Sequence, residues 1–110
     1  DQTEPLPCPY CGALTRPDVV WFGELLPAEV WQAAVREILA CEAVLVIGTS
    51  GQVEPAASLV WYARGRGKSL VEINPAPTLI NGIAEVVLPG TAAEMTPALL
   101  AALAALHAAD

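Results

Sequence analysis

The fold is decided by the stretch Val44-Leu45-Val46-Ile47-Gly48-Thr49-Ser50-Gly51-Gln52-Val53-Glu54-Pro55. Its four consecutive apolar residues predict a strand buried on both faces, as in a central parallel strand that helices cover on both sides. The strand ends at Gly48, and Pro55 is typical of the first position of a helix. This order places Gly48, Thr49 and Ser50 at the carboxyl edge of a parallel sheet, where ligands bind. An ordinary strand-to-helix loop of small residues is the alternative interpretation.

The composition indicates one modest domain, or part of a larger protein, that is able to bury a core. The chain has 110 residues, of which 55% are hydrophobic, and its mean hydropathy is +0.49. No apolar run approaches the ~18 residues of a membrane span, and Asp1-Gln2-Thr3-Glu4 lacks the basic region of a signal peptide. We therefore expect a soluble, cytoplasmic protein that has no membrane partner.

The charge balance argues against nucleic acid as a partner. The formal net charge is -7, and the chain has only five lysine and arginine residues. A protein that binds a phosphate backbone needs a basic face, which so few cations do not supply.

Two of the three cysteines form a C-x-x-C knuckle in Cys8-Pro9-Tyr10-Cys11-Gly12. Two thiolates at this spacing can bind one tetrahedral zinc ion, and an odd cysteine count without a secretory signal favours metal or redox chemistry over disulfides. A complete zinc site needs four ligands, and neither Cys41 nor His107 provides a second close pair. A chance pair is the alternative, and Cys41 is expected to be a small buried hydrophobe.

Hydrophobic spacing predicts alternating strands and helices along the chain. We expect strands over residues 18–22, 44–47, 69–73 and 85–88, helices over residues 27–41, 55–64 and 97–107, and an irregular turn over residues 78–83. Such alternation predicts an α/β fold with a parallel sheet and right-handed crossovers.

The start of the last helix is ambiguous in the sequence. Thr91 and Glu94 fit a capping box, but that start places Pro97 inside the helix at a cost of about 3 kcal/mol. A start with Thr96 as the cap and Pro97 at the first position avoids the cost. We therefore favour a loose turn over residues 92–95, followed by the helix.

Several blocks of the chain together resemble the sirtuins, the NAD-dependent protein deacylases. The blocks are CPYCG (8–12), RPDVVWFGE (16–24), GTSGQVEP (48–55), VEINP (71–75) and LPGTAAEMTPALL (88–100), in the order and spacing of the family. The resemblance implies the carboxyl-terminal portion of a bacterial-type member. Residues 1–14 would be the remnant of a small zinc-binding module, and residues 15–110 the carboxyl-terminal half of a Rossmann-like NAD-binding domain.

The resemblance also implies a set of residues that bind NAD: Gly48, Thr49, Ser50, Asn74, Pro75, Ala76 and Ala92. The Gly-Thr-Ser turn would hold NAD near its ribose and phosphates, a task that suits backbone N–H groups and short hydroxyls. Asn74 matches the asparagine that contacts the adenine-side ribose, and Ala92 matches the small residue beside the adenine. Ala76 stands where the family often has an acidic residue.

A second implied set would contact an acyl-lysine peptide: Val19, Phe22, Gly23, Glu24, Gln52 and Val53. In the family the peptide lies between the two segments that carry these residues, and it adds as a strand through backbone hydrogen bonds. Cys8 and Cys11 match the second pair of a four-cysteine structural zinc site.

No catalytic residue is assigned to this chain. The family's Gly-Ala-Gly-x-Ser phosphate loop, its Gln-Asn-x-Asp block and the His-Gly with the catalytic base lie upstream and have no match here. His107 matches no catalytic position. The resemblance therefore implies deacylase activity for a complete protein in which the remainder of the sirtuin chain is the partner, and an inactive chain when residues 1–110 are alone.

Two other classes of protein explain part of the pattern. A non-catalytic nucleotide-binding domain, such as the middle domain of thiamine-diphosphate enzymes, explains the strand, the Gly-Thr-Ser turn and the helix but neither CPYCG nor RPDVVWFGE. An interaction domain built on a zinc knuckle explains the cysteines but assigns no role to Asn74 or to Gly48, Thr49 and Ser50.

Overall fold

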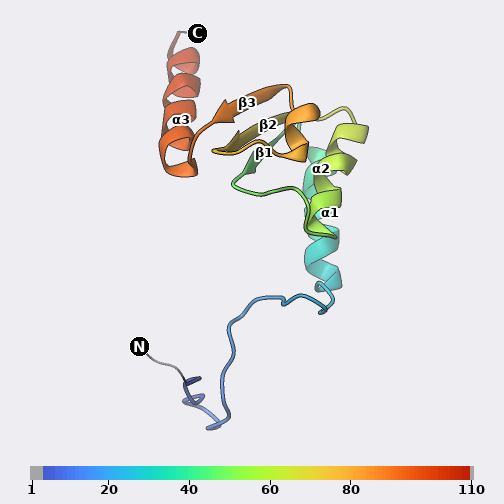
Figure 1. Ribbon diagram of the computed structural model, residues 1–110, viewed down its shortest axis with the longest axis vertical. Coiled ribbons are helices and arrows are strands. Elements are labelled where there is room, and N and C mark those ends of the chain that lie inside the picture. Colours follow the sequence, from blue (N-terminus) through green and yellow to red (C-terminus); the bar gives the residue numbers. More distant parts are fainter. Residues whose placement is uncertain (1–3, 110) are drawn as a thin grey trace. The chain divides into compact units, whose positions relative to one another are not determined.

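The structure, a computed structural model, describes residues 4–109, which form two compact units that divide between Trp31 and Gln32. The elements follow the predicted alternation, apart from the first strand (Figure 1). Their order is α1 (Ala28–Ala40), β1 (Ala43–Ile47), α2 (Ala56–Gly65), β2 (Ser69–Asn74), the 3-10 helix η1 (Leu79–Gly82), β3 (Val86–Pro89) and α3 (Ala92–Ala108).

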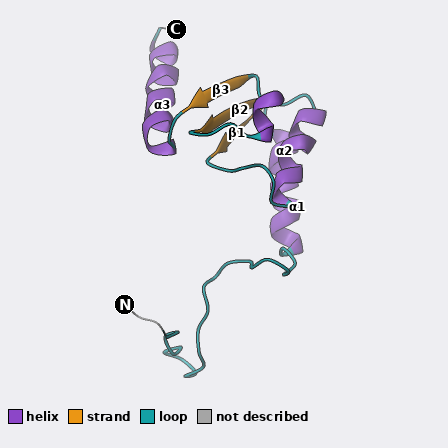
Figure 2. Cartoon of the chain, in the orientation of Figure 1, coloured by secondary structure: helices purple, strands orange, loops and turns teal. Residues whose placement is uncertain are grey.

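The three strands of the second unit form a parallel sheet in the order β1-β2-β3 (Figure 2). The register pairs Val44 with Leu70 and Ile47 with Ile73 across β1 and β2, and Asn74 with Pro89 across β2 and β3. The parallel α/β sheet predicted from the sequence is therefore confirmed. Because all three strands run the same way, their carboxyl ends meet at one edge of the sheet.

The core of the second unit lies on and around β2. Its fully buried side chains include Leu70 and Ile73 of β2 and Ile80 of η1, and α2 packs on β1 and β2 through the buried Ala57 and Ala63. Burial of such apolar side chains is the main source of stability, at roughly 25 cal/mol per Å² of apolar surface.

The prediction that residues 44–47 are buried on both faces is wrong for the described chain. Leu45 and Ile47 are 44% and 39% exposed, whereas Val46 is buried. Among residues 4–109, β1 pairs only with β2 and therefore lies at an edge of the sheet, while β2 has a strand on each side. The apolar run predicted the strand correctly but not its place in the sheet.

A buried carboxylate fastens η1 to the central strand. The Glu72 side chain is fully buried and accepts hydrogen bonds from the Thr78 hydroxyl and from Asn81 Nδ2, the latter at 2.6 Å. Thr78 in turn caps η1, because its Oγ1 accepts from the Ile80 N–H at 3.0 Å and its N–H donates to Asn81 Oδ1 at 2.9 Å. The segment predicted as an irregular turn is thus an ordered helical turn with a capping box.

Residues 18–22 do not form the predicted strand. In the structure they belong to an irregular loop. The Trp21 N–H, which a strand would use in a ladder, donates instead to the carboxylate of Glu24 at 3.0 Å. This apolar run has no strand to pair with among the described residues, so it does not form part of a sheet.

The preferred start of the last helix is also wrong, because α3 begins at Ala92 and contains Pro97. Thr91 Oγ1 accepts from the Glu94 N–H at 3.3 Å, and Glu94 Oε2 accepts from the Thr91 N–H at 3.3 Å and the Thr91 hydroxyl at 2.8 Å. This capping box satisfies the first free N–H groups of the helix. Together with the extra helical turn it offsets the single hydrogen bond that Pro97 removes.

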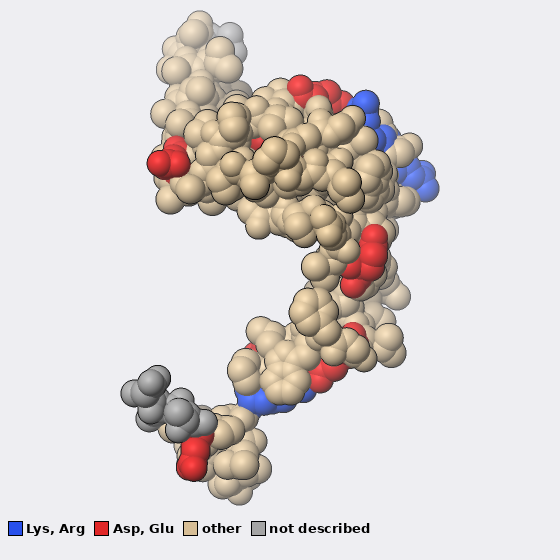
Figure 3. Space-filling view, in the orientation of Figure 1, with Lys and Arg blue, Asp and Glu red and all other residues tan. Residues whose placement is uncertain are grey.

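On the face shown in Figure 3, lysine and arginine atoms form only small clusters, some of them next to aspartate or glutamate atoms. Among residues 4–109 no helix combines the length and hydropathy needed to cross a membrane.

Thr91→Ala tests the start of α3. We expect the free energy of unfolding to fall by about 1 kcal/mol, the usual loss for an N-cap side chain, in urea denaturation followed by circular dichroism. Thr91→Ser keeps the hydroxyl and is the control. A harmless Thr91→Ala together with a destabilising Thr96→Ala would show that the helix begins at Pro97.

Candidate functional site

The carboxyl edge of the sheet brings two of the predicted NAD-binding segments together. The Gly48 N–H donates to the Ile73 carbonyl at 2.9 Å and extends the pairing of β1 with β2. One residue further, Asn74 Nδ2 donates to the Thr49 carbonyl at 2.9 Å, and Asn74 Oδ1 accepts from the Ala76 N–H at 3.1 Å. The Asn74 side chain therefore joins the Gly-Thr-Ser turn to the loop that follows β2.

The turn after β1 requires glycine at two positions because of the backbone conformation, and at Gly51 also because of a close neighbour. Gly48 and Gly51 have φ angles of +65° and +69°, which other L-residues rarely adopt. A Cβ on Gly51 would also lie 2.7 Å from Ile80 Cδ1, whereas one on Gly48 would meet no atom within 4 Å. The Gly51 N–H donates to Thr49 Oγ1 at 3.2 Å. The turn is thus packed against η1 on one side, while Thr49 and Ser50 stay exposed on the other.

A pocket of about 250 Å³ lies beside this edge in the second unit. Its lining combines three residues predicted to bind NAD with four that were not, namely Asn74, Pro75, Ala76, Pro77, Asn81, Val87 and Pro89. Three prolines make its wall stiff, and Asn81 is held by the buried Glu72. The pocket is slightly smaller than typical small-molecule sites.

Ala92 does not line this pocket. It is exposed at the first position of α3, immediately after the Thr91 cap. The structure therefore groups six of the seven predicted NAD-binding residues at one edge of the sheet and places the seventh at the start of α3.

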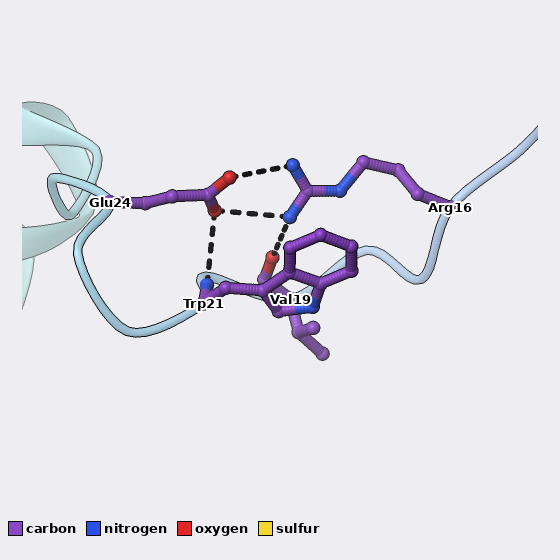
Figure 4. Close-up of polar contacts among 4 residues, drawn as sticks. All are labelled: Arg16, Val19, Trp21 and Glu24. Carbon is purple, nitrogen blue, oxygen red and sulfur yellow. Dashed lines mark hydrogen bonds and ion pairs between the residues drawn. The ribbon is translucent and has the colours of Figure 1, made fainter.

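In the first unit, residues 16–24 form a loop that we call the strap, closed by an ion pair (Figure 4). Arg16 donates through two nitrogens to the two carboxylate oxygens of Glu24, at 2.7 and 3.0 Å, and to the Val19 carbonyl at 3.0 Å. The Arg16 guanidinium carbon also lies 4.0 Å from the centre of the Trp21 ring. The sequence analysis did not identify Arg16 as a residue of the candidate site. The signal that could have indicated it was an arginine eight positions before a glutamate, in a segment that contains Pro17 and Gly23.

The electrostatics of the strap follow from this contact. The Arg16 guanidinium, and then the Trp21 N–H, lower the pKa of Glu24. Glu24, with a smaller contribution from Asp18, raises the pKa of Arg16. Both side chains are partly exposed, so water screens the attraction between their charges. The pair therefore contributes to the shape of the strap more through its fixed hydrogen-bond geometry than through the attraction of its charges.

The residues predicted to contact a peptide differ in how free they are. Phe22 is 91% exposed and Val19 is 55% exposed. The carboxylate of Glu24 and the carbonyl of Val19 are already engaged within the strap. In the second unit Gln52 and Val53 are exposed, and the Val53 carbonyl accepts from the Ala57 N–H at 2.9 Å.

The cysteine knuckle is a tight turn in the first unit. The Cys8 N–H donates to the Ala13 carbonyl at 2.7 Å, and the Gly12 N–H donates to the Cys8 carbonyl at 2.9 Å. The backbone N–H of Tyr10, and then that of Cys11, lowers the pKa of the Cys8 thiol. This favours the thiolate, the form that binds metals. The pair fits half of a tetrahedral zinc site.

Residues 4–109 contain no cluster of three or more metal-ligating side chains. Cys41 is half-buried at the end of α1, where its thiol donates to the Ile38 carbonyl at 3.3 Å. His107 is exposed in the last turn of α3.

An open parallel sheet with helices and a candidate ligand site at the carboxyl edge is the arrangement of the Rossmann-like α/β proteins, whose ligands bind at that edge. The family model described as "Sir2 family" matches residues 1–55. The chain is 48% identical over 100 residues to NAD-dependent protein deacylase 2 of Pyrobaculum aerophilum. The aligned region covers 91% of this chain and 40% of the relative. The chain is 51% identical over 87 residues to an NAD-dependent protein deacylase of Thermus thermophilus, covering 79% and 34%.

Solved structures agree with the sequence comparison. A mutant Sir2 homologue in complex with ADP ribose aligns with a TM-score of 0.87 and 38% identity, covering 100% of this chain and 44% of that one. Sir2Af2 bound to a myristoylated histone peptide aligns with a TM-score of 0.84 and 33% identity, covering 96% and 45%. The chain belongs to the Sir2 family, the sirtuins, and spans about two fifths of the length of the curated relatives.

Gly51→Ala tests how tightly the turn packs on η1. We expect it to lower the free energy of unfolding by about 1–3 kcal/mol more than Gly48→Ala, because both substitutions strain the backbone but only the first overlaps Ile80. The measurement is chemical denaturation of both variants. Equal losses would mean that the turn does not rest on Ile80.

The strap should respond to acid. Because the pKa of folded Glu24 is lowered, the pair stabilises the strap above the unfolded pKa of about 4.3, and this contribution is lost as the pH falls through the folded pKa. We expect NMR titration of the Glu24 carboxyl carbon to give a midpoint below that value in the native chain and a higher midpoint in Arg16→Met. Asp18→Asn should leave the midpoint nearly unchanged, and an unshifted midpoint in Arg16→Met would contradict the assignment.

Proposed function

We propose that this chain is part of an NAD-dependent protein-lysine deacylase and supplies segments that bind NAD and the acyl-lysine peptide. The observation that carries the proposal is the 2.9 Å hydrogen bond from Asn74 to the Thr49 carbonyl. It makes one continuous edge of the two segments that the sirtuin resemblance assigns to NAD. Relatives named NAD-dependent protein deacylases, and a Sir2 homolog solved with NAD, support the proposal.

For the cofactor, the proposal divides the edge into two parts. The exposed Thr49 and Ser50 hydroxyls, with the Gly48 backbone, would hold the ribose and phosphates. Asn74, Pro75 and Ala76, which line the 250 Å³ pocket, would hold the adenine-side ribose. Ala92 would lie beside the adenine. When bound, NAD would supply the ribose carbon that accepts the acyl oxygen and the nicotinamide leaving group.

For the substrate, the proposal assigns backbone recognition to both predicted segments. In the strap the contacts would come from Val19, Phe22, Gly23 and Glu24, and in the second unit from Gln52 and Val53. Family members solved with a myristoylated histone peptide and with a propionylated peptide support an acylated peptide as the ligand. No residue of the described chain is assigned the role of the catalytic base, so these residues bind and orient.

For the metal, we propose that Cys8 and Cys11 are two ligands of a structural zinc ion. The support is their shared turn and the lowered pKa of the Cys8 thiol. The ion would cross-link the knuckle without taking part in the chemistry. The module boundary after residue 14 and a cytoplasmic location remain predictions from the sequence. No structural observation favours a thiamine-diphosphate-type domain or a zinc-knuckle interaction domain instead.

The test is deacylation by the full-length product of the gene that encodes this chain. With an acetyl-lysine peptide we expect nicotinamide release that requires both NAD and the acetyl group. Asn74→Ala should raise the KM for NAD about tenfold with little change in the KM for the peptide, because two hydrogen bonds at the edge are lost, each worth about 0.5–1.5 kcal/mol.

Two comparisons complete this experiment. Asn74→Asp keeps the acceptor for the Ala76 N–H but loses the donor to Thr49 and adds a negative charge beside the proposed phosphate-binding turn, so a KM for NAD at least as high as that of Asn74→Ala is expected. The purified 110-residue chain should release no nicotinamide, and turnover by it would contradict the assignment of the base to other residues. Absence of any NAD-dependent release by the full-length product would refute the proposed function.

A further inference from the structure

The starting observation is that Glu24, predicted to contact the peptide, is already occupied within the strap. Its Oε1 accepts from Arg16 at 2.7 Å, and its Oε2 accepts from Arg16 and from the Trp21 N–H, both at 3.0 Å. Three donors of the strap thus converge on one carboxylate, whose capacity is about four hydrogen bonds. Little of Glu24 remains for a substrate.

Arg16 makes contacts that only an arginine can make together. Its planar guanidinium binds both carboxylate oxygens of Glu24, donates to the Val19 carbonyl at 3.0 Å and stacks on the Trp21 ring at 4.0 Å. A lysine ammonium has neither the fork nor the flat face for this combination. The two ends of the strap and its middle are therefore joined through one side chain (Figure 4).

Backbone pairing contributes little to the shape of the strap. Among the described residues, its one internal backbone hydrogen bond runs from the Glu24 N–H to the Trp21 carbonyl at 3.0 Å. The backbone polar groups of Val20, Phe22 and Gly23 have no partner among residues 4–109. A peptide that adds as a strand needs such free groups on an ordered backbone. Otherwise the conformational entropy of each residue must be lost at the moment of binding.

We propose that Arg16 and Glu24 are positioning residues that close the strap into a preformed docking edge for the acyl-lysine peptide, with the Glu24 carboxylate holding the strap instead of contacting the substrate. Val20, Phe22 and Gly23 then offer their free backbone groups to the peptide. This inference rests on the proposed function and assigns to Arg16 a role in recognition that needs no contact with substrate.

The test compares Glu24→Gln, Arg16→Met and the double variant in the full-length gene product. If the pair acts only by ordering the strap, each single variant should raise the KM for acetyl-lysine peptide by about tenfold, and the double variant should be no worse than either. The kcat and the KM for NAD should stay within about twofold of the wild type. Asp18→Asn, a charge change in the same strap without a hydrogen bond to the pair, should change none of these values.

Other outcomes overturn the inference. A raised KM in Glu24→Gln but not in Arg16→Met, or additive losses in the double variant, would mean that Glu24 contacts the peptide directly. Unchanged KM values in an active enzyme would mean that the pair is incidental, while the proposed function would stand. Binding of a fluorescent acetyl-lysine peptide, measured by polarisation, needs no turnover; a wild-type protein that neither binds nor deacylates it would refute the proposed function itself.

Discussion

The parallel pairing of β1 with β2 is the constraint on which the candidate cofactor site depends. In parallel strands the chain leaves both strands at the same edge, so Gly48 and Asn74 emerge side by side although 25 residues separate Asn74 from Thr49. The Gly48 N–H continues the ladder to Ile73, and the Asn74 amide reaches the next carbonyl. Antiparallel pairing would have sent the two segments to opposite edges and left no common site.

The small helix η1 serves both sides of this edge. Ile80 Cδ1 lies 2.7 Å from the place that a Cβ of Gly51 would take, so the Ile80 side chain packs closely against the turn after β1. Asn81 lines the pocket beside Asn74 and also donates to the buried Glu72. A carboxylate without solvent contact is tolerated because polar side chains satisfy both of its oxygens. Through Ile80 and Asn81, η1 thereby connects the turn after β1 and the pocket beside Asn74 to the buried part of β2.

The strap is ordered by a different means. Where the edge of the sheet relies on backbone hydrogen bonds between strands, the strap relies on one arginine and one glutamate that bind across eight residues. This arrangement leaves the exposed Phe22 and the neighbouring backbone groups free. A ladder would have consumed the same groups, so closure by side chains keeps them available for the peptide proposed above.

The amino-acid sequence alone was sufficient for the alternation of strands and helices from α1 onward, the parallel sheet, the place of Gly48 at its edge, and the family. These depend on local apolar periodicity and on motifs, both of which are written in neighbouring residues. Only the tertiary structure decided that β1 lies at an edge of the described sheet, that α3 begins at Ala92 despite Pro97, and that Glu24 binds Arg16. In each case several partners could bind the same group, which is the edge of a strand for β1, the first N–H groups of the helix for α3 and the carboxylate for Glu24. The winner depends on which groups the folded chain brings within hydrogen-bonding distance.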